Sequence, residues 1–411
     1  MIEQGLRVGV VGGSLAGLTA ALLLRDQGHD VHVYERATGE LKSRGAGIVA
    51  VDPSFRYLTE RTDGRVEDFS TSVPEVVTLG ADGRVLLRED RPHLFTSWAA
   101  LHGALRAAFD DDRYHMASEV LGVDTSSDGA RLRFADGMQE HFDLVIAADG
   151  IGSTIRAQLF PEVQPVDAGY VAWRSAVPAS ALSAGTAELT TGSLVYQLLE
   201  ASHVLVYPIP GSGPDSEGRA PSGARDDLIN LVWYRNVDPE GVDSLLTDVR
   251  GRRQHTTLQP GMVRSEHVEE FRAAARAELA PQVGEVAEVA GEPFLQVVRD
   301  IEVDRMVAGR TVIIGDAAFA ARPHAAAGTA KAAADAWALA EELMVGDGTE
   351  QALARWEVRQ LEIGRSLVAR TREIGDRSQF GGGWRVGERA FQFGLLEPGR
   401  MTIPTEGGRP A

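Results

Sequence analysis

The sequence predicts an α/β protein. A parallel-sheet domain is interleaved with a smaller domain of β-sheet and helices, and a C-terminal helical segment follows. Short apolar runs lead through glycine-containing turns into helical patterns at the N-terminus, near residue 149 and near residue 316. Between them lie stretches in which apolar and polar residues alternate, as in antiparallel strands. The recurrence of the first pattern at distant positions indicates one domain assembled from separate parts of the chain.

The first element is a strand from Arg7 to Val11, followed by the turn GGSLAG and a helical pattern from Leu15 to about Gln27. A second strand, Val31 to Tyr34, ends in Glu35. Such a Rossmann-like unit binds dinucleotides, because its glycines allow a tight turn and close helix packing while the helix N-terminus faces a pyrophosphate. We expect Glu35 to accept bonds from a ribose hydroxyl, and the turn to place three residues at the pyrophosphate: Gly12, Ser14 and Gly17.

A second apolar strand, Leu144 to Ala148, ends in Asp149-Gly150, and Ser153 and Arg156 follow at a predicted helix start. One interpretation is an ordinary strand–turn–helix with Ser153 as its cap. The other places Asp149, Gly150 and Arg156 beside a bound dinucleotide.

The third segment runs from Thr311 to Ala336. Its apolar run Val312–Ile314 breaks at Gly315-Asp316, and an Ala-rich helix follows. A strand, a Gly-Asp corner and a helix start bring a carboxylate and free backbone N–H groups to one point, which suits a sugar-phosphate or ribityl chain. We therefore expect Gly315 and Asp316 to bind the cofactor.

Composition limits the class of protein. The 411 residues are 24% charged and 44% hydrophobic, which indicates a globular protein of two or three domains. A net charge of −18 argues against a nucleic-acid partner. The absence of cysteine excludes disulfides and thiolate metal sites. No signal peptide or membrane-length apolar run is evident, so the expectation is a cytoplasmic protein with no metal and no membrane contact.

The remaining elements follow from periodicity. We expect a β pattern from Tyr170 to Arg235, including the segment TAELTTG, and helices at 99–109, 242–250, 268–279 and 349–372. The predicted parallel-sheet domain comprises residues 1–72, 98–168 and 296–345. The smaller domain comprises 73–97 and 169–295, and the C-terminal helical segment is 346–411.

Together these motifs resemble those of the single-component flavin-dependent aromatic hydroxylases, which have the p-hydroxybenzoate hydroxylase fold. The likeness extends to the segments YVAWR, YPIP and RPHAAAG, and within the family it is greatest to enzymes that hydroxylate dihydroxypyridines. The resemblance implies FAD as cofactor and a smaller domain that covers the substrate. It adds five residues to the expected FAD site: Arg36, Arg44, Gly47, Ala327 and Gly328.

The sequence also departs from the family pattern. Phe319 replaces the usual histidine after G-D-A-A, Trp98 replaces an arginine at the start of the third helix, and Lys331 follows an altered G-x-G-x-N segment. These changes affect the expected detail of the flavin surroundings and leave the FAD assignment in place.

The resemblance implies hydroxylation of a small electron-rich ring, such as 2,6-dihydroxypyridine, by a flavin C4a-hydroperoxide formed with O₂ and NADPH or NADH. His324, in the loop expected to face the flavin, could accept a proton from a ring hydroxyl, or could simply bond to backbone. Tyr207 is a second candidate for the site, although most strand aromatics belong to the core. Arg174 and Arg235 could hold an anionic substrate or be exposed to solvent.

Three alternatives remain open at this stage. The substrate could be a larger polycyclic or polyketide-type ring, because the fold does not determine the substrate. The chain could also be a flavin-binding sensor without turnover. The C-terminal segment could support a homodimer or only cap the FAD domain.

Overall fold

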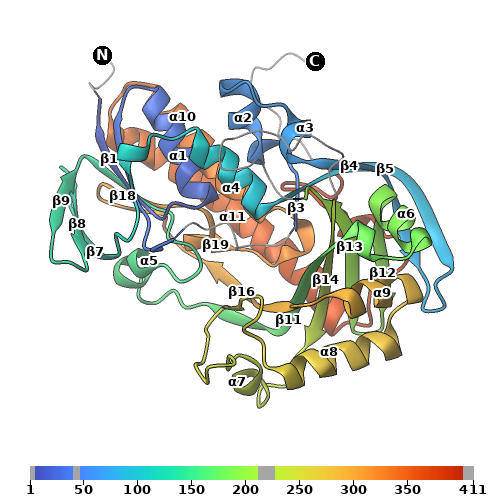
Figure 1. Cartoon of the computed structure of the whole chain (residues 1–411). Coiled ribbons are helices and arrows are strands. Elements are labelled where there is room, and N and C mark those ends of the chain that lie inside the picture. The colour runs from blue at the N-terminus through green and yellow to red at the C-terminus, as the bar shows by residue number, and fades with distance from the viewer. Residues whose placement is uncertain (1–4, 40–46, 212–226, 401–411) are drawn as a thin grey trace.

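The structure is a computed structural model and describes residues 5–39, 47–211 and 227–400. A parallel sheet and a larger mixed sheet form its two halves, and a long helix near the C-terminus, α11, runs between them (Figure 1). The mixed α/β architecture predicted from the sequence is confirmed.

The parallel sheet has the strand order β17-β18-β10-β1-β2-β6, and only its edge strand β17 runs antiparallel to its neighbour. Its register places Val11, Ala147 and Ile313 side by side at the carboxyl ends of neighbouring strands. The three glycine-containing turns therefore begin at adjacent points of one sheet edge, where ligands of open α/β sheets bind. The strands are β1 (Arg7–Val11), β2 (Asp30–Tyr34), β6 (Tyr114–His115), β10 (Leu144–Ala147), β17 (Val307–Ala308) and β18 (Thr311–Ile313).

Helices cover this sheet because each has an apolar face. In α1 the side chains of Leu18 and Leu22 are fully buried, and α1 packs against α10. A small antiparallel sheet lies beside α5 at the edge of this half (Figure 1). The elements are α1 (Leu15–Asp26), α4 (Trp98–Ala107), α5 (Thr154–Leu159), α10 (Gly328–Leu343), α11 (Thr349–Gln379), β7 (Val120–Thr125), β8 (Ala130–Phe134) and β9 (Gln139–Phe142).

The larger sheet has the order β15-β16-β11-β14-β13-β12-β4-β5-β3. The strands are β3 (Gly47–Val49), β4 (Thr71–Leu79), β5 (Val85–Ser97), β11 (Val166–Pro178), β12 (Ser193–Leu199), β13 (Ser202–Ile209), β14 (Leu228–Asn236), β15 (Thr257–Leu258) and β16 (Phe294–Glu302), and β19 (Phe319–Ala320) pairs with β16.

Side chains of this sheet alternate between two faces. Trp173 and Trp233 point to the face covered by α8 and α9, where Trp173 stacks on Phe271 at 4.8 Å between ring centres. Their neighbours Arg174 and Tyr234 point to the opposite face, toward the parallel sheet. The helices of this half are α6 (Ala184–Gly192), α7 (Val242–Leu245), α8 (Ser265–Glu278) and α9 (Pro281–Val289), whereas α2 (Arg56–Arg61) and α3 (Val66–Phe69) pack into the core of the parallel-sheet half.

Two local predictions were wrong. The segment TAELTTG forms helix α6 rather than a strand, because burial of Thr186 and Thr190, one turn apart on the same side, follows the helical period. The Thr190 hydroxyl donates to the Thr186 carbonyl oxygen, so this buried polar group is satisfied within the helix. The helix expected over 242–250 is only the single turn α7. The sequence-based reading also omitted α9, which Pro281 opens and whose Val283, Val286 and Ala287 are buried.

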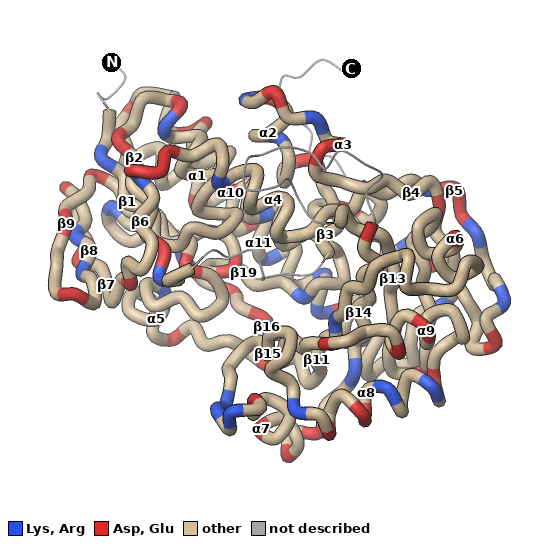
Figure 2. The backbone as a smooth tube through the Cα atoms, in the orientation of Figure 1, with Lys and Arg blue, Asp and Glu red and all other residues tan. Residues whose placement is uncertain are grey.

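Helix α11 extends from Thr349 to Gln379, seven residues beyond the predicted end. No helix in the described part of the chain is long and apolar enough to cross a membrane. Acidic and basic residues are interspersed along the described chain (Figure 2). The division into three domains with the boundaries given above stays a prediction.

Candidate active site

A cavity of about 370 Å³ lies between the two sheets. The parallel-sheet side contributes the three glycine-containing turns, and the larger sheet contributes aromatic and polar side chains. Seven of the residues predicted for the site line this cavity: Ser14, Gly47, Gly150, Tyr207, Asp316, Ala327 and Gly328. The structure thus brings together residues that are up to 314 positions apart in sequence, from Ser14 to Gly328.

The first turn has a geometry that requires glycine. Gly12 has φ +101°, and a Cβ there would lie 2.4 Å from the Ala148 carbonyl oxygen. A Cβ on Gly17 would lie 2.0 Å from the Gly12 carbonyl oxygen. The Glu35 carboxylate is buried and accepts from the backbone N–H groups of Gly13 at 3.0 Å and Ala37 at 2.8 Å. Glu35 therefore supports the shape of the turn, in addition to any bond to a ribose.

The second turn is tied to the third through Arg156. The Arg156 guanidinium is buried and donates to the carbonyl oxygens of Ile151 at 2.8 Å and Ala317 at 3.0 Å. Asp149 Oδ2 accepts from the Ile155 N–H at 3.3 Å, whereas its buried Oδ1 has no partner among the described residues. Burial raises the pKa of Asp149.

The third turn presents Asp316 to the cavity. Gly315 has φ +60° and its N–H donates to Asp335 Oδ2 at 2.9 Å. The Asp316 side chain is exposed and lines the cavity. Ala326 adopts the left-handed conformation, with φ +54°, just before α10 begins at Gly328. This backbone conformation places Ala326, Ala327 and Gly328 in the lining of the cavity.

These features suit a bound FAD. A tight glycine turn lies at the start of α1, an exposed carboxylate lies at Asp316, and the unpartnered Oδ1 of Asp149 is buried close by. All three lie at the same edge of the parallel sheet, at the ends of strands β1, β10 and β18.

The larger sheet forms the other side of the cavity. The Tyr207 hydroxyl donates to the Gly47 carbonyl oxygen at 3.0 Å, and the Tyr207 ring stacks on Phe95 at 4.3 Å between ring centres. Burial raises the pKa of Tyr207 to about 12, so the phenol stays protonated near neutral pH. The Gly47 N–H donates to Asn230 Oδ1 at 3.0 Å. Strands β13 and β14 therefore fix the position of Gly47.

Arg174, on strand β11, contributes a positive charge to the larger-sheet side of the cavity. Its half-buried side chain lines the cavity, its Nε is buried without a partner, and it forms no ion pair with a described residue. The charge lowers the pKa values of Tyr207 and Tyr234 against the larger effect of burial, which raises them. A guanidinium in this setting favours an anion in the cavity. Arg235 instead pairs with Glu278, away from the cavity.

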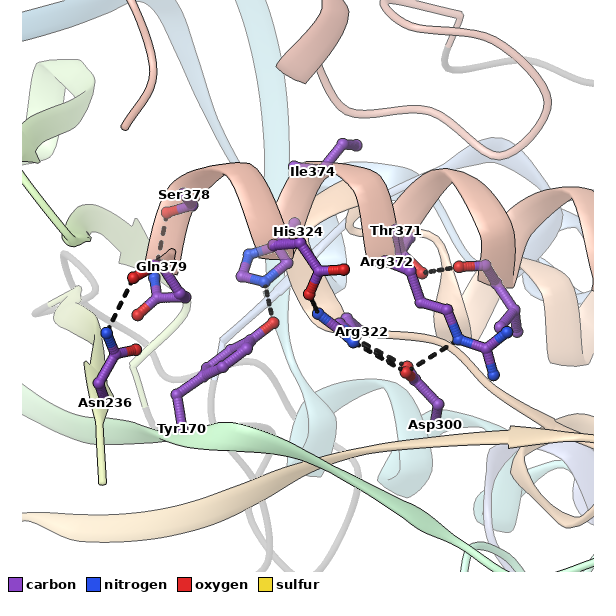
Figure 3. A network of polar contacts seen from close by, with 12 residues as sticks. Tyr170, Asn236, Asp300, Arg322, His324, Thr371, Arg372, Ile374, Ser378 and Gln379 are labelled. Atoms are coloured by element: carbon purple, nitrogen blue, oxygen red, sulfur yellow. Dashed lines mark hydrogen bonds and ion pairs between the residues drawn. The ribbon is translucent and has the colours of Figure 1, made fainter. Parts of the chain in front are cut away.

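His324 is placed behind the cavity wall rather than on it. Its neighbours Pro323 and Ala326 line the cavity, whereas the His324 ring is buried and its Nε2 lies 2.6 Å from the Tyr170 hydroxyl oxygen (Figure 3). Its Nδ1 has no partner among the described residues. Burial lowers the pKa of His324 to about 3, so the ring is neutral at physiological pH.

Beside this histidine, an ion-pair network links the cavity loop to α11 (Figure 3). Arg322, next to Pro323, pairs with buried Asp300 at 3.0 Å and with Asp376 at 2.6 Å. Arg372 also pairs with Asp300, at 3.0 Å. The loop that carries His324 is therefore held from both β16 and α11.

The other predicted residues lie around the cavity or apart from it. Six predicted residues belong to the three turns but do not line the cavity: Gly12, Gly17, Glu35, Asp149, Arg156 and Gly315. Arg36 is exposed and is not among the lining residues, and Arg44 lies outside the described residues. Sequence reasoning did not place Gln296 and Phe393, which line the cavity, and neither has a local motif. A further cavity, of about 500 Å³, lies near Arg56 and Trp337 and contains none of the predicted residues.

The described residues contain no cluster of His, Cys, Asp and Glu that could hold a metal ion.

Comparison with known proteins places this site in a family. Residues 10–69 match the NAD(P)-binding Rossmann-like domain, and residues 167–300 match the FAD binding domain-like family. The chain is 37% identical over 403 residues to 2,6-dihydroxypyridine 3-monooxygenase of Paenarthrobacter nicotinovorans, with 97% of this chain and 98% of the relative covered. It is 26% identical to 6-hydroxynicotinate 3-monooxygenase of Bordetella bronchiseptica, over 80% of each chain.

Among solved structures, 2,6-dihydroxypyridine-3-hydroxylase from Arthrobacter nicotinovorans superposes with a TM-score of 0.89 at 35% identity, covering 96% of this chain and 98% of that one. The chain belongs to the FAD-dependent monooxygenases of the aromatic hydroxylase fold. The predicted family, enzyme class and cofactors are thereby confirmed.

Proposed function

We propose that this monooxygenase hydroxylates a small, electron-rich hydroxylated ring of the 2,6-dihydroxypyridine kind, using O₂ and NADPH or NADH. The observation that carries the proposal is the cavity between the two sheets. One of its walls is built from the cofactor-type turns, and the other carries Tyr207, Tyr234 and Arg174. A relative that matches 97% of the chain is named for 2,6-dihydroxypyridine, which supports this substrate class.

For the cofactor, we propose that the first turn and Glu35 hold the ADP part of FAD and that Asp316 binds the ribityl or pyrophosphate part. When bound, FAD supplies the redox chemistry, by accepting a hydride from NAD(P)H and activating O₂. The complete proposed set is Gly12, Ser14, Gly17, Glu35, Arg36, Arg44, Gly47, Asp149, Gly150, Arg156, Gly315, Asp316, Ala327 and Gly328.

For the substrate, we propose that the chain's own residues orient the ring and set its charge. Arg174 would pair with an ionised ring hydroxyl and so stabilise the ionised form of the substrate. Ionisation of the hydroxyl makes the ring more electron-rich. Tyr207 would act mainly by orientation, because its hydroxyl is already bonded to Gly47 and remains protonated. The cavity walls would limit the access of water to the reacting atoms.

A proton role for His324 remains a proposal. The ring is one residue from the cavity lining and has an unpartnered Nδ1, which supports contact with a ligand or water. Its lowered pKa makes it a weak proton acceptor, so its contribution would depend on a hydrogen bond at Nδ1 rather than on full protonation.

A substrate panel tests the proposed function. The FAD-loaded protein would be assayed for NADH and NADPH oxidation with 2,6-dihydroxypyridine, 6-hydroxynicotinate, p-hydroxybenzoate and a tetracycline. The proposal predicts the largest acceleration with the dihydroxypyridine. Equal or faster oxidation with the tetracycline would contradict it, and no acceleration by any ring would support a non-catalytic flavoprotein.

The homodimer and the cytoplasmic location expected from the sequence remain predictions. Light scattering during gel filtration tests the first, and fractionation of the producing cells tests the second.

A further inference from the structure

A buried ion pair lies directly beneath the turn that presents Asp316. Lys331 and Asp335 lie one helical turn apart in α10, with Nζ and Oδ2 separated by 2.7 Å and with side chains 1% and 0% exposed. The same Oδ2 of Asp335 accepts from the Gly315 N–H at 2.9 Å. The pair therefore joins α10 to the residue that precedes Asp316.

The ring of Phe319 lies against this pair, and Gly364 leaves room for the ring. The Lys331 ammonium lies 4.7 Å from the centre of the Phe319 ring, in a cation–π arrangement. Gly364 of α11 leaves room for that ring, because a Cβ there would lie 2.4 Å from it. Phe319, which stands where the family pattern has a histidine, thus lies in contact with Lys331.

Burial of the Lys331–Asp335 ion pair costs free energy of folding. Two buried charges seldom add stability over apolar side chains of similar size, because both lose their hydration. A cation in the first turns of a helix is also opposed by the helix dipole. A role in folding alone is therefore a weak explanation for Lys331. The hydrogen bond from the Gly315 N–H to Asp335 provides a more specific explanation of the pair, because this N–H has no other acceptor among the described residues.

We propose that Lys331 and Asp335 are positioning residues for FAD. Lys331 keeps Asp335 ionised and in place, Asp335 holds the Gly315 N–H, and the turn thereby keeps the Asp316 carboxylate directed into the cavity. The proposal rests on the proposed role of Asp316 in binding FAD.

Two neutral double variants separate positioning from stability. Lys331→Met with Asp335→Leu removes both charges and the acceptor for Gly315. Lys331→Met with Asp335→Asn also removes both charges but keeps an amide oxygen at the acceptor position. The FAD dissociation constant of each flavin-free protein would be measured by fluorescence quenching, alongside its melting temperature. Arg355→Gln is the control, because it removes the partly exposed ion pairs that Arg355 of α11 forms with Glu342 of α10 and with Asp347.

The proposal predicts that the Leu double variant binds FAD at least tenfold more weakly than the parent, while the Asn double variant and Arg355→Gln stay within about threefold. Equal FAD affinity of the Leu and Asn double variants would overturn it, because the acceptor would then have no effect on the cofactor. A parent protein that binds no FAD would instead contradict the proposed function.

If the Leu double variant does not fold, hydrogen exchange on the flavin-free parent decides the question. The proposal requires that Asp335 hold the Gly315 amide before FAD binds. We expect this amide to exchange at least a hundredfold more slowly than an unstructured amide. Exchange at the unprotected rate would overturn the proposal.

Discussion

The Tyr207 hydroxyl donates to the Gly47 carbonyl oxygen across 160 residues of sequence, at 3.0 Å. The bond joins strand β13 of the larger sheet to β3, at the point where Gly47 and Tyr207 both line the cavity. A Cβ on Gly47 would lie 2.6 Å from the Tyr207 ring, so the contact also requires glycine. This bond therefore fixes the relation between a predicted cofactor residue and a predicted substrate residue.

Tyr207→Phe should impair binding rather than proton transfer. Loss of the hydroxyl leaves the Gly47 carbonyl without this donor, which costs about 1 kcal/mol. We expect KM for the ring substrate to rise about fivefold, with kcat within about twofold of the parent. Because the pKa of Tyr207 is raised to about 12, the pH profile of kcat between pH 6 and 9 should keep its shape. A lost ionisation in that range would show that Tyr207 does transfer a proton.

Asp316→Ala should yield largely colourless protein. The substitution removes the carboxylate that lines the cavity at the third turn. The flavin content per protein, read from the absorption spectrum after purification, is the measurement. Asp304→Ala is the control, because Asp304 is 90% exposed, lies between β16 and β17 and is not part of the cavity lining. Full yellow flavin content in the Asp316 variant would exclude the proposed role.

Arg174→Gln should weaken binding of an ionised ring. The guanidinium has no described ion-pair partner, so an anionic ligand would supply the missing charge. Loss of a charged hydrogen bond of about 1.5–3 kcal/mol raises the substrate dissociation constant about 10- to 100-fold. Arg235→Gln, on the same sheet but paired with Glu278, should change it little. The affinities follow from spectral titration with 2,6-dihydroxypyridine, and an unchanged value for Arg174→Gln would exclude the ion pair.

His324 should make the protein less stable as the pH falls. Burial lowers its pKa to about 3 in the folded state, whereas the unfolded chain titrates near 6.5. Between these values the unfolded state binds more protons, so acid favours unfolding. From pH 6.5 to 5 this histidine alone should cost about 2 kcal/mol of unfolding free energy.

Urea unfolding of the parent and of His324→Gln at both pH values measures this effect, because glutamine lacks the titration. We expect the variant to lose less stability than the parent over that interval. An equal loss in both proteins would show that His324 is accessible to protons in the folded state.

Much of the cofactor side could be predicted from local sequence. A tight turn at Gly12 and a carboxylate at Asp316 follow from short segments, because the strand before each turn fixes where its residues lie. The pairing of Val11 with Ala147, and of Ala147 with Ile313, then brings the three turns together. Parallel strands with turns at their carboxyl ends have only one edge at which those turns can meet.

The substrate side could not be predicted to the same depth. A strand residue such as Arg174 faces either the helices or the cavity, and its face depends on the register of distant strands. His324 follows a cavity residue in sequence, yet its ring turns toward Tyr170. The helix α6 was missed because threonine and glycine favour strands and turns locally, whereas tertiary packing decided the outcome.

Incorporation of labelled oxygen tests the central claim most directly. The FAD-loaded protein would be incubated with 2,6-dihydroxypyridine and NADH or NADPH under ¹⁸O₂, and the product examined by mass spectrometry. The account predicts a trihydroxypyridine that contains one ¹⁸O atom per ring, formed with consumption of one reduced nicotinamide. Oxidation of the nicotinamide with no labelled ring product, or a product oxygen derived from water, would contradict it.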